Sequence, residues 1–201
     1  MANVYVPISN VAFGDTWSAG SHNNLMANAA GGYLSASVIQ LFPAQGANVP
    51  LTGGVAALEY VESTDAGTWK PAFMQLRFDD TTSEARLWQF HMPYTVTAPI
   101  LKVGYRMAGA NTSKSVKFDA YLACVSDGDT SVNAKAFATV NSATVTCPDA
   151  ANTFDVATIT LTNANSIAEG DLVTILLARD VGVANDATGD CIVMFVVLQY
   201  Q

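Results

Sequence analysis

The sequence has no apolar run long enough to cross a membrane as a helix. Its longest apolar run, from Cys191 to Leu198, covers eight residues, whereas a membrane-spanning helix needs about 20. The run therefore predicts a buried strand, covered on both faces by a second sheet or by a neighbouring subunit. Residues 1–10 lack the basic start and the apolar segment of a signal peptide. We expect no export by that route and no membrane partner.

Basic residues are scarce. Nine Lys and Arg stand against 17 Asp and Glu in 201 residues, so the formal net charge is −8, and the basic residues are scattered. A polyanion such as DNA is repelled by the average surface of such a protein, so we expect no nucleic-acid partner. Charged residues make up only 13% of the chain and apolar residues 50%, a composition that excludes a disordered chain.

Cysteine is also scarce. The three cysteines, Cys124, Cys147 and Cys191, are an odd number without CxxC spacing, so neither a disulfide framework nor a thiolate zinc site is indicated. We expect free, mostly buried thiols in a protein made in a reducing cytoplasm. A single bridge between Cys124 and Cys147 is the alternative.

Motifs of catalysis are missing. Only His22 and His91 are available as near-neutral bases, and neither has metal-ligand spacing. His91 should point outward from a strand. The sequence contains no GxSxG, P-loop or GxGxxG motif. We therefore predict a non-enzymatic protein with no catalytic, cofactor-binding or metal-binding residue.

The sequence has enough Asp and Glu residues that a catalytic pair of carboxylates, as in a glycosidase, must be considered. Asp79, Asp80, Glu84 and Asp119 are the candidates, and such an enzyme needs two of them facing each other in a cleft. The simpler interpretation is that Asp79 and Asp80 end a strand and begin a turn, because Asp readily binds nearby backbone amides.

Two further acidic segments have cation-binding and turn interpretations. The segment from Asp127 to Ser131 resembles the start of a calcium loop, but Val132 and Ala138 occupy the positions of the required glycine and glutamate. We interpret it as a turn. The loop from Asp180 to Asp190 has acidic residues for a hard cation, but no spacing that fixes coordination, and a solvated loop is favoured.

What the sequence does contain is a series of short segments rich in Val, Ile, Thr, Phe and Tyr, separated by Gly, Asn, Asp and Pro. This pattern is typical of an all-β sandwich or barrel. In the segment 114–125, alternation places Val116, Phe118, Ala120, Leu122 and Cys124 inward. The ten expected strands are 33–42, 55–62, 72–78, 85–92, 100–107, 114–125, 132–140, 154–162, 172–179 and 191–200.

The N-terminal part of the chain differs in composition. Residues 1–32 are rich in Asn, Ala, Ser and Gly and predict an arm or long loop, with a short helix expected over 24–30. Residues 33–201 are expected to form a single sandwich domain. The candidate interface residues are Phe13 and Trp17 in the arm and Trp69 in a turn-like setting, because large aromatic side chains anchor interfaces.

Two segments of the second half carry a resemblance to bacteriophage virion proteins. Residues 85–93, which end in Met-Pro, lead into the strand 101–106, and residues 167–180 are followed by Asn185-Asp186, Gly189-Asp190 and a last strand ending at Tyr200. The likeness covers about residues 72–201. It implies a jelly-roll-like antiparallel β-sandwich that forms trimers on phage particles, and it brings no catalytic residue.

The leading functional hypothesis is therefore a phage capsid decoration or cement protein, made in the host cytoplasm and incorporated into the virion. Its expected partners are its own copies, in a homotrimer, and other virion proteins such as the major capsid protein. A phage tail or fibre module is an alternative within this class. A carbohydrate-binding β-sandwich is the alternative outside it, and its mark is two or three coplanar Trp or Tyr side chains on one exposed face.

Overall fold

A computed structural model describes residues 37–48, 54–64, 67–94 and 96–200. Residues Val38–Tyr200 form one compact unit, which is described by itself. The expected arm over 1–32, with Phe13, Trp17, His22 and the helix over 24–30, lies outside the described residues. Among the described residues, no helix has the length and apolar character to span a bilayer.

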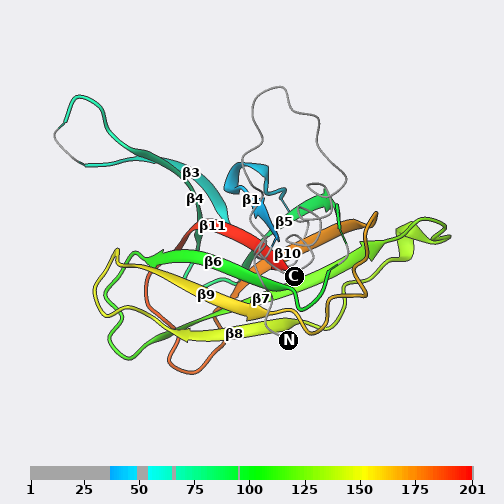
Figure 1. Cartoon of the computed structure of the whole chain (residues 1–201). Coiled ribbons are helices and arrows are strands. Elements are labelled where there is room, and N and C mark those ends of the chain that lie inside the picture. Colours follow the sequence, from blue (N-terminus) through cyan, green and yellow to red (C-terminus); the bar gives the residue numbers. More distant parts are fainter. Residues whose placement is uncertain (1–36, 49–53, 65–66, 95, 201) are drawn as a thin grey trace, which may run out of the picture. The chain divides into compact units, whose positions relative to one another are not determined.

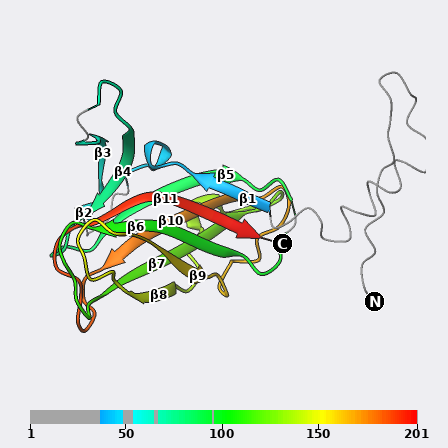
Figure 2. The same ribbon diagram turned by 60° about the vertical axis from the view of Figure 1, so that its left-hand side comes forward.

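The strands form two sheets packed face to face (Figure 1, Figure 2). One sheet has the order β3 (Ala57–Glu62), β4 (Ala72–Phe78), β11 (Cys191–Tyr200), β6 (Ile100–Met107) and β9 (Phe154–Thr160), and β1 (Ser37–Leu41) also pairs with β11. The other has the order β2 (Gly54–Val55), β5 (Glu84–His91), β10 (Leu172–Asp180), β7 (Ser115–Val125) and β8 (Asn141–Thr146). Within both orders neighbours run antiparallel, except that β2 lies parallel to β5. The protein is a jelly-roll β-sandwich, as predicted.

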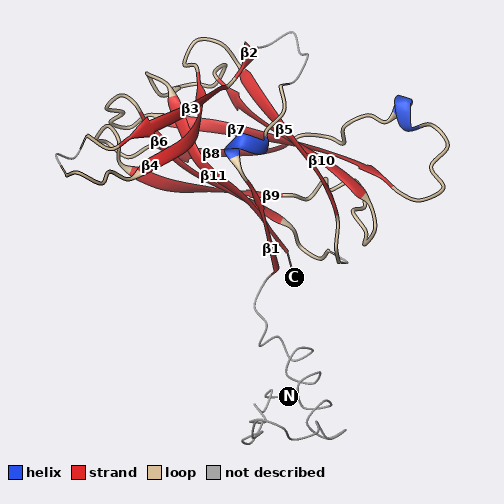
Figure 3. Cartoon of the chain, turned by 90° about the horizontal axis from the view of Figure 1, so that it is seen from above, coloured by secondary structure: helices blue, strands red, loops and turns tan. Residues whose placement is uncertain are grey.

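Helix is limited to two short 3₁₀ turns in the described part of the chain, η1 (Pro43–Gln45) and η2 (Val132–Ala134) (Figure 3). The first lies between β1 and β2, and the second lies in the long connection between β7 and β8. The sequence therefore folds almost entirely through strand pairing, in agreement with its content of β-branched and aromatic residues.

The core lies between the sheets and follows the predicted alternation. All five side chains predicted to point inward from β7 are buried, from Val116 to Cys124. Phe118 packs edge-on against Tyr105 of the opposite sheet, with ring centroids 5.4 Å apart. Trp88 is also buried, and its indole N–H donates to the carbonyl of Phe42 at 2.9 Å. A buried indole needs such a partner, because its N–H cannot reach water.

The predicted strand over 132–140 is wrong. This segment contains η2 and a loop, and the strand β8 begins at Asn141. Val132 and Phe137 remain 52% and 38% exposed, so their apolar character does not face a core. At the first residue of β8, the buried side chain of Asn141 holds the loop that follows β9, because the backbone amide of Asn163 donates to Asn141 Oδ1 at 2.8 Å.

The three cysteines are free and buried, as predicted, and no bridge joins Cys124 to Cys147. Burial raises the pKa of the Cys124 and Cys147 thiols to about 11 and also raises the pKa of Cys191. These thiols are therefore almost fully protonated at neutral pH, and a protonated thiol is a poor nucleophile.

We expect none of the three thiols of the native protein to react with a thiol reagent such as DTNB at pH 8. With a pKa of about 11, roughly one thiol in a thousand is ionised at that pH, and the sheets block access as well. Titration in 6 M guanidinium chloride should release all three. A native cysteine that reacts as fast as free cysteine would contradict the buried placement.

Candidate functional site

The outer face of the six-stranded sheet is the face turned away from the five-stranded sheet. Its residues alternate with fully buried ones such as Leu76, Val103 and Val193, and the register aligns Arg106 with Phe154 on one side and Ile192 on the other. The outer face includes Glu59, Val61, Phe73, Gln75, Arg77, Lys102, Gly104, Arg106, Phe154, Val156, Ile192, Met194, Phe195 and Val197.

A β-bulge in β11 shapes the middle of the outer face. The register shifts between Val193 and Phe195, and the core takes both Val193 and Val196. The two residues between them, Met194 and Phe195, are therefore both directed outward and are partly exposed. Bulges commonly redirect side chains in this way beside functional sites.

Aromatic rings lie on both sides of this bulge. Phe195 lies over Gly104, where a Cβ would come within 2.3 Å of the ring, so a side chain at position 104 would push the ring away. Phe154 packs against Phe195 with ring centroids 5.9 Å apart. Phe154 is 50% exposed and Phe73 43% exposed, so apolar ring surface is open to a ligand.

A polar network crosses the strands beside the rings. Gln75, only 2% exposed, donates to Glu59 at 3.1 Å and accepts from Arg106 at 3.2 Å. Arg106 also donates to the side-chain oxygen of Asn152, and Arg77 pairs with Glu59 at 3.0 Å. Because each member is held by the next, these donors and acceptors have fixed positions.

The network and the rings surround a hollow of about 420 Å³. Its size falls within the range of small-molecule sites, which combine apolar walls with a few placed polar groups. The hollow is lined by Val61, Glu62, Ser63, Thr64, Phe73, Gln75, Arg106, Asn152, Phe154 and Met194. We take this part of the outer face as the candidate functional site.

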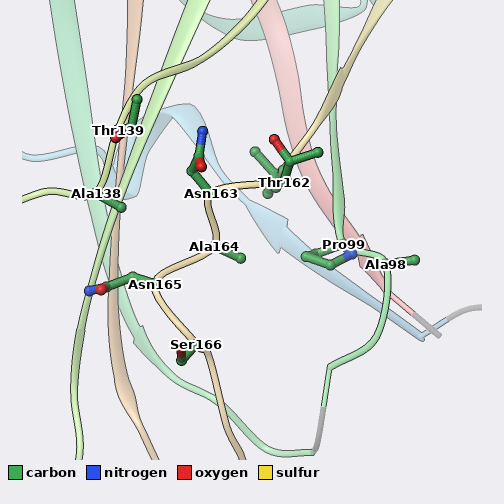
Figure 4. A pocket seen from close by; sticks show the side chains of 10 residues that line it. Ala98, Pro99, Ala138, Thr139, Thr162, Asn163, Ala164, Asn165 and Ser166 are labelled. Atoms are coloured by element: carbon green, nitrogen blue, oxygen red, sulfur yellow. The ribbon is translucent and has the colours of Figure 1, made fainter.

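A second, larger hollow, of about 710 Å³, lies between the segments that precede β6 and β8 and the loop that follows β9 (Figure 4). It is lined by residues 98–99, 138–139 and 161–166, without an aromatic or a charged side chain. Asn163 uses its own amide groups within the fold, bonding to Asn141 and to the carbonyl of Val140. The backbone at Asn165 and Ser166 has positive φ, which fits a tight loop. This hollow has little to recognise a ligand with.

The carboxylates weighed as a glycosidase pair have structural partners. Asp79 accepts from the hydroxyl of Thr81 at 2.6 Å and from the backbone amides of Thr81 and Thr82 at 2.7 and 2.8 Å, and these bonds lower its pKa. The predicted turn role of Asp79 is thereby confirmed. Asp80 accepts from the amide of Gly189 at 2.7 Å.

The remaining two carboxylates are also engaged. Glu84 accepts from the amide of Asp79 at 2.8 Å, whereas Asp119 belongs to β7, where it accepts from Ser142 at 2.5 Å and pairs with Lys117 at 3.5 Å. Asp79 and Asp80 form a close group with Asp190 instead, with oxygens within 4.8 Å. Asp79, Asp80 and Glu84 therefore organise a turn and strand ends, and Asp119 links the neighbouring strands β7 and β8.

The segment from Asp127 to Ser131 is a turn, as predicted. Asp129 accepts from the amide of Ser126 at 2.8 Å and pairs with Lys135 at 2.6 Å. His91 is exposed on β5, also as predicted.

The loop from Asp180 to Asp190 is exposed or partly exposed except at the buried Ala187, as expected of a solvated loop, and a buried arginine anchors it. Arg179, at the end of β10, is fully buried and pairs with Asp186 at 3.1 Å. The guanidinium also donates to the carbonyls of Ala187 at 2.6 Å and Gly189 at 3.0 Å. In the sequence, the alternation of apolar residues along 172–179 places position 179 on the same face as the buried Val173, Ile175 and Leu177. This periodicity is the signal by which a buried arginine could have been predicted.

The hairpin of β3 and β4 projects beyond the sandwich (Figure 1, Figure 2). Trp69, near its tip, is 92% exposed, and Tyr60 is 65% exposed. Met74 shares a face with the buried Leu76 and Phe78, as predicted, but is 44% exposed because the hairpin extends past the core. The role of Trp69 in an interface stays a prediction, as do those of Phe13 and Trp17.

The class that the fold and the site define is a jelly-roll β-sandwich with one open sheet face of rings and fixed polar groups. No protein-family model matches the sequence, and none of the curated proteins does. Among solved structures, a family 35 carbohydrate binding module from Clostridium thermocellum is similar at 16% identity and a TM-score of 0.45, covering 81% of this chain and 98% of its own.

Two further solved structures give similar values. A CBM35 from Paenibacillus barcinonensis has 14% identity and a TM-score of 0.45, with 82% of this chain and 99% of that chain covered. A xylan-binding module, CBM15, has 11% identity and a TM-score of 0.39, with 83% and 97% covered. Similarity at this level transfers no ligand to the present chain.

Proposed function

We propose that the protein is a non-catalytic binding module that holds a saccharide chain on the outer face of its six-stranded sheet. The observation that carries the proposal is the hollow of about 420 Å³ in which exposed rings lie beside a fixed polar network. Sugars present both kinds of surface, because a pyranose ring has apolar faces of C–H groups and a rim of hydroxyls.

The residues of the hollow match these two surfaces. Phe154 and Phe73 supply exposed ring surface against which C–H groups can pack. Asn152, Gln75 and Arg106 supply amide and guanidinium groups whose positions are set before binding. Preorganisation of this kind reduces the entropy lost on association. The mark named for a carbohydrate module, two or three coplanar Trp or Tyr side chains, is not found on this face among the described residues, where the rings are phenylalanines and those of Phe154 and Phe195 are tilted by 43°.

Binding to a glycan array, followed by titration calorimetry on the best ligand, tests the proposal. Phe154→Ala is expected to weaken binding at least tenfold, because it removes one exposed wall of the hollow. Phe137→Ala is the matched control: Phe137 is 38% exposed and packs against Tyr121 of β7, in the other sheet. Absence of any glycan ligand, or equal weakening by both variants, would contradict the proposed site.

We propose as a second candidate function the virion module suggested by the resemblance of residues 72–201 to phage proteins. The projecting hairpin favours it, because Tyr60, Trp69 and Met74 expose large apolar side chains where a protein partner could cover them. In this proposal the protein is a homotrimer that contacts a major capsid protein or a tail component of the virion, after synthesis in the host cytoplasm.

Native mass measured by light scattering on a sizing column tests this second candidate. A trimer is expected, and Trp69→Ser combined with Tyr60→Ser is expected to weaken association with capsids or tails by at least tenfold, since buried aromatic anchors dominate interfaces. Tyr94→Ser, at another tyrosine that is 61% exposed, serves as the control. A monomer that binds no capsid or tail would exclude this candidate.

A further inference from the structure

The outer face holds three of the nine basic residues of a strongly acidic protein, Arg77, Lys102 and Arg106. Arg77 is paired with two carboxylates, Glu59 at 3.0 Å and Asp190 at 3.4 Å, and Glu62 lines the adjacent hollow. Arg106 and Lys102 are the two cations of this face that make no ion pair with the described residues. The basic residues elsewhere include two that are buried, Arg86 and Arg179.

Arg106 is held in place without being neutralised. Its two described hydrogen bonds go to Gln75 and to Asn152, both of which accept through neutral amide oxygens. By contrast, Lys117 and Lys135 pair with carboxylates at 2.7 and 2.6 Å. A guanidinium has five N–H donors, so Arg106 retains donors for an anion after making these two bonds.

Lys102 lies on the same strand and the same side of the sheet, four residues from Arg106, or about 13 Å along an extended chain. It forms no ion pair with any residue that the structure describes, and its side chain is partly exposed. Between the two cations lies Gly104 under the ring of Phe195, with Val156 beside it on β9. Along β6, the outer face therefore has a cation at Lys102, an apolar surface formed by Phe195 and Val156, and a second cation at Arg106.

We infer that the ligand of this face is an acidic polysaccharide whose sugar units carry carboxylates. The inference rests on the proposed saccharide-binding function and specifies its ligand class. An extended chain of such sugars lies along β6 with its C–H surfaces on Phe195 and Val156, and presents separate carboxylates to Arg106 and Lys102. Arginine suits the first position, because its planar fork can bind a carboxylate through two parallel hydrogen bonds.

Charge complementarity selects this occupant over a neutral glycan. A neutral chain leaves Lys102 without a partner and leaves the spare donors of Arg106 to water, whereas a carboxylated chain engages both.

The test uses the full chain with polygalacturonate, alginate and hyaluronate, each compared with its methyl ester, which masks the carboxylates on the same backbone. Titration calorimetry should show binding to at least one acidic form and at least tenfold weaker binding to its ester. Raising NaCl from about 50 mM to about 500 mM should weaken binding, since the contacts are partly exposed. Dextran sulfate separates carboxylate recognition from general attraction of anions.

Lys102→Gln is expected to weaken binding of the acidic form about tenfold and to leave binding of the ester unchanged. Arg106→Gln also removes donors of the proposed saccharide site, so it is expected to weaken binding of both forms, and binding of the acidic form more than that of the ester. Lys114→Gln is the matched control, because it makes the same change in net charge at a residue between β6 and β7. Circular dichroism and the urea midpoint show that each variant remains folded.

Each other outcome overturns the inference and says whether the proposed function survives. Binding of esters or neutral glycans as tight as that of the acids would overturn the carboxylate preference and keep a saccharide site. Equal losses in Lys114→Gln and the two site variants, or equal binding of dextran sulfate, would reduce the effect to general charge. Binding of no glycan at all would overturn both the inference and the proposed function.

Discussion

Replacement of Arg179 by methionine is expected to lower the free energy of unfolding by about 3–5 kcal/mol, the range for removing one partner of a buried ion pair. Arg179 is fully buried, and its guanidinium donates to Asp186 at 3.1 Å and to the carbonyls of Asp79, Ala187 and Gly189 at 3.2, 2.6 and 3.0 Å. Methionine fills similar space but leaves these oxygens without their donor, and the Asp186 carboxylate without its cation.

The measurement is urea unfolding followed by the fluorescence of the buried Trp88. Lys117→Met is the matched control, because it removes a cation from the pair with Asp180 at 2.7 Å, where the lysine side chain is 24% exposed. Its expected cost is about 1 kcal/mol or less. If Arg179→Met lowers the free energy of unfolding no more than Lys117→Met does, the bonds of the buried Arg179 guanidinium do not stabilise the fold as proposed.

The loss in Arg179→Met should depend on pH in a defined direction. Burial raises the pKa of Asp186, and Arg179 opposes that rise, so the variant should have a still higher pKa at Asp186. A carboxyl with a folded-state pKa above its unfolded value stabilises the fold below the unfolded pKa, and this contribution is lost as the pH rises through the folded pKa. The deficit of the variant should therefore be smaller at pH 4 than at pH 7.

Phe118→Ala is expected to lower the free energy of unfolding by about 3–5 kcal/mol, the range for truncating a buried phenylalanine. Phe118 is fully buried in β7, and its ring makes a T-shaped contact with the ring of Tyr105 in the opposite sheet. Truncation removes this contact and leaves a cavity between the two sheets, whose hydrogen-bonded strands cannot easily move to fill it. The stability loss should therefore include both the lost burial of apolar surface and the cost of the cavity.

The same urea experiment measures this loss, and Phe137→Ala again provides the control. Phe137 lies outside the strands and is 38% exposed, so its truncation should cost less than half as much. Equal losses at the two positions would mean that the contact between Phe118 and Tyr105 does not join the sheets as described. Phe118→Leu, which retains most of the volume, should recover more than half of the stability.

Periodicity in the sequence was sufficient to predict most strands and their buried faces. The segments 72–78, 100–107 and 191–200 have the predicted bounds, because alternation of large apolar residues reports which face meets a core. The segment 132–140 misled because its apolar residues have no sheet to face. Local pattern cannot distinguish a strand from an exposed loop when the deciding factor is the position of the opposite sheet.

The candidate site could not be predicted from the sequence, because its residues are brought together by the pairing of strands that are distant in the chain. Gly104 and Phe195 are far apart in the chain and meet only through the register of β6 and β11. The network from Glu59 to Asn152 similarly depends on three strand pairings. The expectation that residues 191–200 are covered on both faces also depended on neighbours that the sequence does not specify, and Met194 and Phe195 are in fact partly exposed.

The place of β11 in the sheet has a consequence for the order in which the chain folds. β11 pairs with β6 through most of its length and with β4 near its start, where Leu76 lies opposite Val193. These strands precede β11 by long stretches of chain, so the sheet has a high contact order and should fold slowly. During synthesis, β4 and β6 lack this shared partner until Cys191–Tyr200 leaves the ribosome. Their unpaired edges are then open to aggregation, which makes this interval the one in which a chaperone would help most.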